Sequence, residues 1–282
     1  MATLKVQAHE NNFGACVEGI DLSQPISAEL AETLHQVWYQ YQVIYFPNQP
    51  LTPEQLERFT AAIGPFGTEP YLKTLPNYEH IVEIRREPDE PVAPFGASWH
   101  SDWSFRDAPP SATILYSQIV PPVGGDTHYA DGIRAFETLD PVLAAELEEM
   151  QAVHSARRSY SLEGYKRSGG EQRSVAVEPN DNAMQTKVHP VVRTHPKSGR
   201  KVLWINPVYT LSIEGLSQSD SDAMLKKLYG HALDSQFIYA HRWAANMLTM
   251  WDNRSVQHCA QGGYDGHRRV MLRTTVAGDV PF

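Results

Sequence analysis

The tripeptide His100-Ser101-Asp102 combines two side-chain types that bind metal ions. If the surrounding segment Trp99–Phe105 is a strand, residues two apart point to the same side, so His100 and Asp102 would face the same way. One further histidine would complete a 2-His-1-carboxylate iron site, whose other coordination positions stay open for chemistry. By itself the pattern is weak, because a chain with 12 histidines and 33 acidic residues in 282 positions contains about one His-x-Asp/Glu match by chance.

The candidate for the third ligand is His258, at the end of the segment Trp251-Asp252-Asn253-Arg254-Ser255-Val256-Gln257-His258. A late strand of a jelly roll can lie beside an early one, so the long separation from Asp102 is no obstacle. A lone histidine is more often structural than a metal ligand. His258 stands out because of two arginines downstream of it.

These arginines, Arg269 and Arg273, are four positions apart in a β-rich stretch, so both point to one side of a strand while Arg268 points to the other. A guanidinium group is well suited to bind a buried carboxylate through two hydrogen bonds. Two inward arginines therefore predict two anionic groups, one near each end of a cavity. The alternative for Arg273 is an ion pair with an internal Asp or Glu.

The run Gly124-Gly125-Asp126-Thr127 follows Pro121-Pro122, so the chain should turn sharply and enter a strand. At the start of that strand, Thr127 can offer a hydroxyl group to a bound carboxylate. Taken alone, this run is an ordinary turn.

The elements that must position these residues are mostly short strands. Strands are expected within Leu4–Ile20 and over Val43–Phe46, His80–Arg86, Trp99–Phe105, Ala112–Val120, Asp126–Asp131, His189–His195, Val202–Asn206, Phe237–Trp243, Leu248–Asp252, Ser255–Ala260 and Arg268–Val276. Helices are expected after Ser27, over Thr52–Ile63, near Ile133–Leu139 and Val142–Met150, and over Ser217–Leu233.

This pattern predicts one domain over residues 1–282, mainly β with flanking helices, in the form of a double-stranded β-helix (a cupin-like jelly roll). The jelly-roll core should cover about 98–278, with helical decoration over about 27–64 and 217–233. Residues 155–187 are rich in Ser, Arg, Gly and Asn, which predicts a mobile insert or lid.

Composition restricts the partners. A net charge of −9 argues against non-specific nucleic-acid binding, and no apolar run is long enough to span a bilayer. The first residues lack the apolar stretch of a signal peptide, and two cysteines, Cys16 and Cys259, suit a reducing compartment. We therefore expect a cytoplasmic protein without a membrane partner, and a homo-oligomer (dimer or tetramer).

Several of these motifs together resemble the taurine dioxygenase (TauD/TfdA) family of Fe(II)/2-oxoglutarate enzymes, and the resemblance runs almost end to end. The motifs are Tyr41-Gln42-Val43-Ile44-Tyr45-Phe46-Pro47, Trp99-His100-Ser101-Asp102, Gly124-Gly125-Asp126-Thr127, His189-Pro190-Val191-Val192-Arg193-Thr194-His195-Pro196, Trp251-Asp252-Asn253-Arg254 with His258, and Arg269 with Arg273-Thr274-Thr275-Val276. Within the family the chain looks closest to the (R)-phenoxypropionate (aryloxyalkanoate) dioxygenases. That similarity rests on Leu72-Lys73, Ile84-Arg85-Arg86-Glu87, Asp107-Ala108-Pro109-Pro110 and Val153-His154-Ser155-Ala156.

The resemblance implies a role for each matching position. His100, Asp102 and His258 would bind iron. Arg269, with help from Thr127, would bind the distal carboxylate of the cosubstrate 2-oxoglutarate. Arg273 would hold an acidic group on the primary substrate.

Two departures from the family concern the substrate. Glu69 stands where taurine enzymes place a sulfonate-binding histidine, and Gly96 stands where they place an asparagine. A carboxylate at position 69 would repel a sulfonate if it faced the site, which argues against taurine; the alternative is that Glu69 is exposed to solvent. Four apolar neighbours would favour an aromatic or apolar substrate, with core packing as the alternative role for them. They are Tyr71, Leu72, Trp103 and Phe105.

The resemblance implies an oxidoreductase that uses Fe(II), 2-oxoglutarate and O2 to hydroxylate a small anionic substrate, a carboxylate such as an aryloxyalkanoate or a sulfonate. The products would include succinate and CO2, and the hydroxylated substrate could break at a C–O or C–S bond.

Two other classes of protein stay open on the residues alone. One is a metal-dependent isomerase or hydrolase on a cupin-like barrel, which leaves Arg269 unexplained; the other is a non-catalytic jelly-roll binding protein.

Overall fold

Strands outnumber helices in the computed structural model, which describes residues 4–282. The strands are β1 (Lys5–Ala8), β2 (Ala15–Glu18), β3 (Val43–Phe46), β4 (Val82–Arg86), β5 (Ala112–Ile119), β6 (Thr127–Asp131), β7 (Gln151–Ser155), β8 (Thr186–Pro190), β9 (Val192–Thr194), β10 (Lys201–Leu203), β11 (Thr210–Ile213), β12 (Ile238–His241), β13 (Leu248–Asp252), β14 (Val256–Ala260) and β15 (Arg269–Val276). The helices are α1 (Ala28–Tyr41), α2 (Pro53–Ile63), α3 (Gly132–Glu137), α4 (Pro141–Glu148), α5 (Arg157–Tyr160), α6 (Leu162–Arg167) and α7 (Gln218–Ala232). Short 3-10 turns are η1 (Glu10–Asn12), η2 (Gly170–Gln172), η3 (Asp181–Met184) and η4 (Ser235–Phe237).

Two largely antiparallel sheets enclose the centre of the molecule. The larger sheet has the strand order β1-β2-β3-β13-β5-β15-β4, and the smaller has the order β12-β6-β14. A buried cluster between them takes side chains from both sheets, including Leu115, Tyr129, Trp251, Val256 and Met271. Strands that are neighbours in these sheets are often far apart in the sequence, as in a jelly roll.

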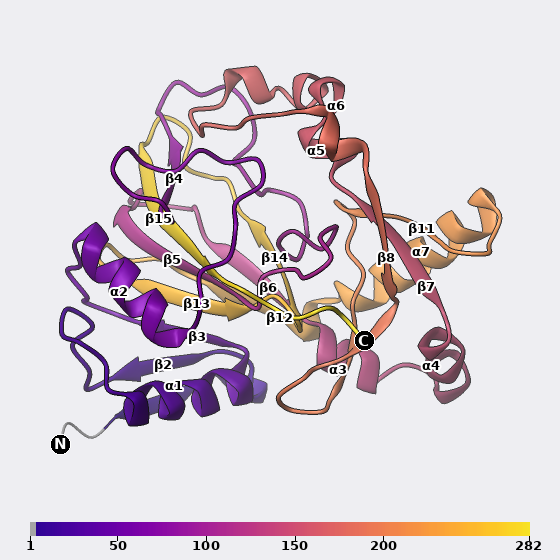
Figure 1. Ribbon diagram of the computed structural model, residues 1–282, viewed down its shortest axis with the longest axis horizontal. Coiled ribbons are helices and arrows are strands. Elements are labelled where there is room, and N and C mark those ends of the chain that lie inside the picture. The colour runs from indigo at the N-terminus through magenta and orange to yellow at the C-terminus, as the bar shows by residue number, and fades with distance from the viewer. Residues whose placement is uncertain (1–3) are drawn as a thin grey trace.

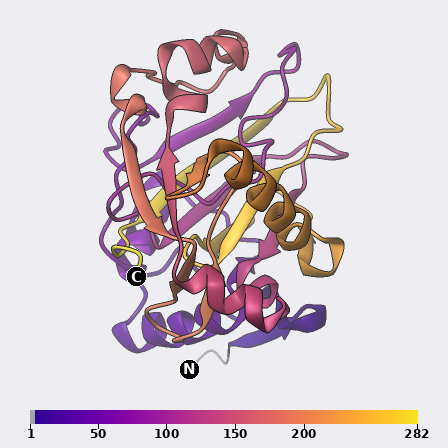
Figure 2. The same cartoon turned by 90° about the vertical axis from the view of Figure 1, so that its right-hand side faces the viewer.

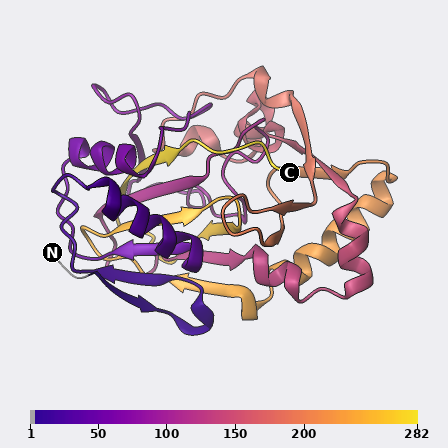
Figure 3. The same ribbon diagram turned by 60° about the horizontal axis from the view of Figure 1, so that its bottom comes forward.

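Helices α1 and α2 cover the other face of the large sheet (Figure 1). Figure 3 shows the same two helices alongside this sheet from a second direction. The cluster beneath them joins helix and strand residues, including Leu34, Trp38, Phe59, Ile44, Met250 and Leu272. Burial of this apolar surface accounts for the fixed position of both helices on the sheet.

A second helical layer lies at the opposite side of the molecule, where α7 faces the viewer in Figure 2. It packs with α4 against the small sheets β11-β7-β8 and β10-β9. The shared cluster includes Leu147, Ala152, Leu203, Leu225 and Leu228.

The expected helix starts are confirmed by their caps. Ser27 Oγ accepts a hydrogen bond from the Leu30 amide at the start of α1. At the start of α2, Thr52 and Gln55 form a capping box, and Pro53 occupies the first turn. These caps satisfy amide groups that an unprotected helix end would leave without partners.

Strand β15 alternates between the two faces of the large sheet, as predicted. Leu272 belongs to the cluster beneath α1 and α2, and Thr274 Oγ1 lies 2.7 Å from Thr60 Oγ1 of α2. The odd-numbered positions face the other way, so Arg269 and Arg273 both point between the sheets and are buried. The parity of the strand therefore places both guanidinium groups inside the molecule.

The expectation that Trp99–Phe105 is a strand is wrong. His100 forms an isolated bridge with His258, and the chain then turns, with Trp103 at a φ of 50°. An extended strand could not place Trp103 in this left-handed conformation. Apolar and β-branched content cannot reveal such a turn, because the partner that fixes it lies more than half the chain away.

Residues 155–187 contain α5, α6, η2 and η3 rather than a structureless loop. Figure 1 shows α5 and α6 together at one end of the molecule. Tyr160, Val175 and Ala183 anchor this segment in an apolar cluster. The domain boundaries expected from the sequence stay predictions.

Candidate metal centre and adjoining cavities

The structure brings His100, Asp102 and His258 together. One potential ligand atom from each residue lies within 4.8 Å of the others, and all three residues are buried. The Nε2 atom of His100 lies 3.6 Å from Asp102 Oδ1, and that of His258 lies 3.9 Å from Asp102 Oδ2. The two imidazoles and the carboxylate therefore converge on one point.

A pair of backbone hydrogen bonds holds two of these residues side by side. The His100 amide donates to the His258 carbonyl at 3.0 Å, and the His258 amide donates back to the His100 carbonyl at 2.8 Å. Asp102 lies in the turn after this bridge, where its amide donates to Asn253 Oδ1 at 3.3 Å. The two ligands of the tripeptide are thus aligned by a bridge and a turn, and not by a shared strand face.

The protonation states suit a metal ion. Burial lowers the pKa of His258 to about 3 and also lowers the pKa of His100. Burial alone would raise the pKa of Asp102, but Arg273 and the two imidazoles outweigh it and lower that pKa to about 2. His100 Nδ1 lies 2.7 Å from the Ser98 carbonyl, so Nδ1 carries the proton and Nε2 keeps its lone pair for a metal.

A buried hydrogen-bond chain orients the carboxylate. Asn253 Nδ2 donates to Thr113 Oγ1 at 2.9 Å, and Thr113 Oγ1 donates to Asp102 Oδ2. Trp251 Nε1 fixes the amide of Asn253 by donating to its Oδ1 at 3.1 Å. The sequence analysis did not identify Thr113, whereas Asn253 belongs to the motif Trp251-Asp252-Asn253-Arg254. The alternating strand β5 gave no sign that one of its inward residues would meet Asp102.

Arg269 lies in a cavity of about 60 Å³ next to the three ligands. Its guanidinium is buried and makes one long hydrogen bond, 3.4 Å from Nη2 to the Gly125 carbonyl, while Nε has no partner. No carboxylate of residues 4–282 lies within ion-pair distance of it. Thr127 Oγ1 accepts from Trp243 Nε1 at 3.0 Å, which leaves the hydroxyl proton of Thr127 free to donate into the cavity.

Arg273 has the opposite surroundings. Its Nη1 lies 3.1 Å from Glu69 Oε2, and its Nη2 lies 3.3 Å from Asp102 Oδ2. Glu69 also accepts from Trp103 Nε1 at 3.1 Å and from Thr275 Oγ1 at 3.2 Å. Three donors directed at one carboxylate are typical of its ionised form. Of the two interpretations for Arg273, the structure thus supplies the internal ion pair.

The alternative that Glu69 is exposed to solvent is wrong, since its side chain is 6% exposed. Burial raises the pKa of Glu69, and Arg273, Thr275 and Trp103 act in the opposite direction. The loop that carries Glu69 has no periodic pattern, so the sequence alone could not show which way the side chain points.

The four predicted apolar pocket residues lie behind the site. Tyr71, Leu72 and Trp103 are buried, and with Phe105 they join an apolar cluster that includes Tyr160. The rings of Tyr71 and Tyr160 stack with centroids 4.7 Å apart. None of the four lines either cavity at His100.

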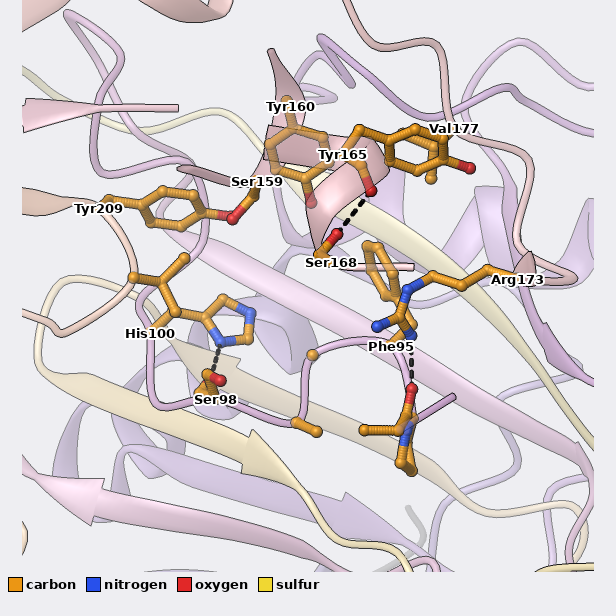
Figure 4. Close-up of a pocket in the computed structure, with 15 residues that line it drawn as sticks. Phe95, Ser98, His100, Ser159, Tyr160, Tyr165, Ser168, Arg173, Val177 and Tyr209 are labelled. Atoms are coloured by element: carbon orange, nitrogen blue, oxygen red, sulfur yellow. Dashed lines mark hydrogen bonds between the residues drawn. The ribbon is translucent and has the colours of Figure 1, made fainter. Parts of the chain in front are cut away.

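A second, outer cavity of about 190 Å³ adjoins His100 (Figure 4). The loop before the metal ligands forms one wall, the segment from α5 to Val177 forms a second, and Val208 with Tyr209 completes the lining. Both cavities share Phe95, Gly96 and His100 in their linings. Sequence reasoning missed this chamber, because its second wall was expected to be a mobile insert.

Comparison with known proteins gives a consistent result over the whole chain. Residues 5–275 match the family described as taurine catabolism dioxygenase TauD, TfdA family. An (S)-phenoxypropionate/alpha-ketoglutarate-dioxygenase of Sphingobium herbicidovorans is 30% identical, covering 95% of this chain and 92% of that protein. An alpha-ketoglutarate-dependent 2,4-dichlorophenoxyacetate dioxygenase of Cupriavidus pinatubonensis is 33% identical, covering 95% of each chain.

The fold also matches solved structures. The crystal structure of AAD-2 in complex with Mn(II) and N-oxalylglycine superposes with a TM-score of 0.80, at 27% identity and over 99% of each chain. The expected jelly roll is confirmed by this likeness and by the two facing sheets.

Proposed function

Because the chain belongs to the TauD, TfdA family, we propose that it is a dioxygenase that uses Fe(II), 2-oxoglutarate and O2 to hydroxylate a small organic acid. His100, Asp102 and His258 would hold the iron. Arg269 and Thr127 would bind the distal carboxylate of 2-oxoglutarate. A bound iron would supply oxidation of a substrate C–H bond by O2, with 2-oxoglutarate as the co-reductant that is converted to succinate and CO2.

The donor set supports iron. Two neutral imidazoles and one carboxylate form the ligand set of non-haem iron oxygenases and leave coordination positions for small molecules. The low pKa values of His258 and Asp102 keep both groups in the form that binds metal at neutral pH. The hydrogen bond from Thr113 keeps the carboxylate oriented.

The single observation that carries the cosubstrate assignment is the unpaired guanidinium of Arg269. A buried cation without an acidic partner is costly, and a bound carboxylate would compensate it. The cavity places this cation beside the metal ligands, and the Thr127 hydroxyl supplies a second donor. 2-Oxoglutarate has a carboxylate at each end. One carboxylate could bind the metal while the other reaches the Arg269 guanidinium.

For the primary substrate we propose an acid with an aromatic or apolar body, such as an aryloxyalkanoate. Hydroxylation of a carbon that bears an ether oxygen gives an unstable product, so cleavage of the C–O bond would follow. Arg273 and Glu69 form a buried ion pair beside the candidate ligand Asp102. A paired Arg273 argues against taurine, whose sulfonate would need a free cation at this place.

We also propose a cytoplasmic location and a homo-oligomeric assembly. No helix within residues 4–282 is long and apolar enough to cross a membrane. Cys16 and Cys259 are free thiols, which suits the cytoplasm. The proposed homo-oligomer predicts a mass of two or four chains in sedimentation equilibrium, and a single-chain mass would contradict it.

The test of the proposed function uses anaerobically purified protein with Fe(II) and 2-oxoglutarate. We expect one equivalent of bound metal, acid-stimulated formation of succinate that requires O2, and loss of metal and turnover in Asp102→Ala. A metal-dependent isomerase or hydrolase would act without O2 and 2-oxoglutarate. A non-catalytic binding protein would hold no stoichiometric metal.

A further inference from the structure

We propose that the outer cavity is the primary-substrate chamber and that Arg173 binds the acidic group of the substrate there. This inference rests on the proposed function, since it takes His100 as a metal ligand. It assigns substrate recognition to an arginine outside β15, on the segment that carries α5, α6 and η2. The ligand class is an aromatic carboxylate.

The chamber reaches the metal centre at one of its three candidate ligands, His100, whereas Asp102 and His258 line only the inner cavity. His100 lines both cavities, whereas Arg269 and Thr127 line only the inner one. Gly96 lies in the shared wall at a φ of 77°, where a Cβ would come within 3.4 Å of His100 Cε1. Glycine therefore leaves the wall between the cavities without a side chain beside the metal ligand.

Arg173 is the cation of the outer chamber. Its Nη1 donates to the Ala93 carbonyl, and within residues 4–282 no carboxylate forms an ion pair with it. A guanidinium with a single carbonyl partner keeps donors for a bidentate carboxylate. Figure 4 shows Arg173 beside Phe95, across the chamber from His100 and Tyr209.

Two further arginines, Arg273 and Arg86, are already paired with carboxylates. Arg273 lies between Glu69 and Asp102, and it lines the inner cavity rather than the outer one. Arg86 donates to Asp265 at 2.8 Å and lines neither cavity. An incoming acid would have to displace an ion-paired carboxylate at either residue. At Arg173 the nearby carboxylate of Glu90 acts through its charge without forming an ion pair.

Aromatic rings form much of the remaining wall. Phe95, Tyr160, Tyr165 and Tyr209 all line the chamber. Rings of this kind bind an aryl group by offset or edge-to-face contact. An aromatic acid would place its ring among them, its carboxylate at Arg173 and a C–H bond toward the metal ligands.

The test measures binding instead of turnover. Protein loaded with Mn(II) and N-oxalylglycine is titrated calorimetrically with phenoxyacetate and with its neutral amide, phenoxyacetamide. For Arg173→Met we expect phenoxyacetate affinity to fall at least about tenfold while phenoxyacetamide affinity changes less than about twofold. Arg173→Lys should keep part of the preference for the acid.

The matched control is Arg167→Met, because Arg167 lies on the same segment with a largely exposed side chain paired to Glu163. It should leave both affinities unchanged. Equal weakening of acid and amide in Arg173→Met would show that Arg173 only anchors the Ala93 loop, and would overturn the inference. So would wild-type protein that binds neither probe or does not prefer the acid.

If the proposed function itself is wrong, the outcome differs from the one expected when only the role of Arg173 is wrong. When the function is wrong, N-oxalylglycine does not bind to the wild-type protein, whether or not Mn(II) does. If both bind and the preference for the acid survives in Arg173→Met, only the role of Arg173 is wrong.

Discussion

The two ends of β15 carry the same residue type on the same face and yet differ in electrostatic environment. Among residues 4–282, no carboxylate forms an ion pair with Arg269, whereas Arg273 lies between two carboxylates. Strand parity accounts for the shared direction, and loops from elsewhere in the chain account for the difference. One arginine is thus available to a ligand, and the other is part of the protein's own charge balance.

Unfolding free energies should separate the two arginines most strongly. Arg273→Met leaves Glu69 and Asp102 buried without their shared cation and should destabilise the metal-free protein by about 3 kcal/mol. Arg269→Met removes an unpaired buried cation and should be close to neutral or stabilising. Urea denaturation at pH 7 checks both values, and equal losses would contradict the comparison.

A double variant controls for lost packing. Glu69→Gln combined with Arg273→Met removes both members of the pair and should recover part of the stability that Arg273→Met loses. If the double variant is as unstable as the sum of the two single variants, Glu69 and Arg273 do not interact in the way the structure shows.

Cosubstrate affinity should show the reverse order. Arg269→Ala removes the guanidinium that we assign to the distal carboxylate and should weaken 2-oxoglutarate binding by about 100-fold, which is about 2.7 kcal/mol. Arg269→Lys keeps the charge and should lose less. Calorimetry on Mn(II)-loaded protein gives both constants. Unchanged affinity in Arg269→Ala would remove the basis for the cosubstrate site.

Acid should lower the stability of the folded protein through the two histidine ligands. Burial lowers the pKa of His258 to about 3, below its ordinary value of 6.5, so the folded protein keeps this imidazole neutral where the unfolded chain protonates it. Stability is therefore complete above pH 6.5 and is lost as the pH falls toward 3, by at most about 1.4 kcal/mol per pH unit for this group. His100 should act in the same direction.

Other buried histidines also contribute to this loss of stability. The contribution of His258 is therefore measured as the difference between the wild type and a His258 variant. The free energy of unfolding of metal-free wild type and of His258→Gln is compared between pH 7 and pH 5. The variant should show the shallower decline, and parallel curves would mean that His258 is not held neutral by the fold.

The smallest expected effect concerns Thr127 in the Arg269 cavity. Thr127→Val removes one neutral hydroxyl donor and should weaken 2-oxoglutarate binding by about five- to tenfold, or about 1 kcal/mol. It also leaves Trp243 Nε1 without its acceptor. The loss should be absent in the Arg269→Ala background if both groups act on the same carboxylate. Additive losses would place Thr127 on a different part of the cosubstrate.

Features set by local chemistry could be predicted from the sequence. The helix starts at Ser27 and Thr52 follow from their capping groups, and the inward direction of Arg269 and Arg273 follows from strand parity. Strand β13 has the predicted bounds, Leu248–Asp252. Each of these depends on residues only a few positions apart.

Features set by contacts between distant loops could not be predicted. The turn at Trp103 and the orientation of Glu69 depend on partners that no spacing reveals, namely the bridge to His258 and the ion pair to Arg273. The chamber that contains Arg173 depends on how residues 157–173 fold back over His100. A sequence pattern can propose that a residue is buried, but not which neighbour it meets.

The backbone bridge between His100 and His258 also has a consequence for biosynthesis. Its two residues are separated by more than half of the chain, so their pairing closes a very large loop and is expected to form late in folding. A chain that has not yet been made as far as β14 has two of the three ligands and no third. Iron would therefore find its complete binding site only in protein whose barrel is already closed, and a half-made chain would not generate oxidant on the ribosome.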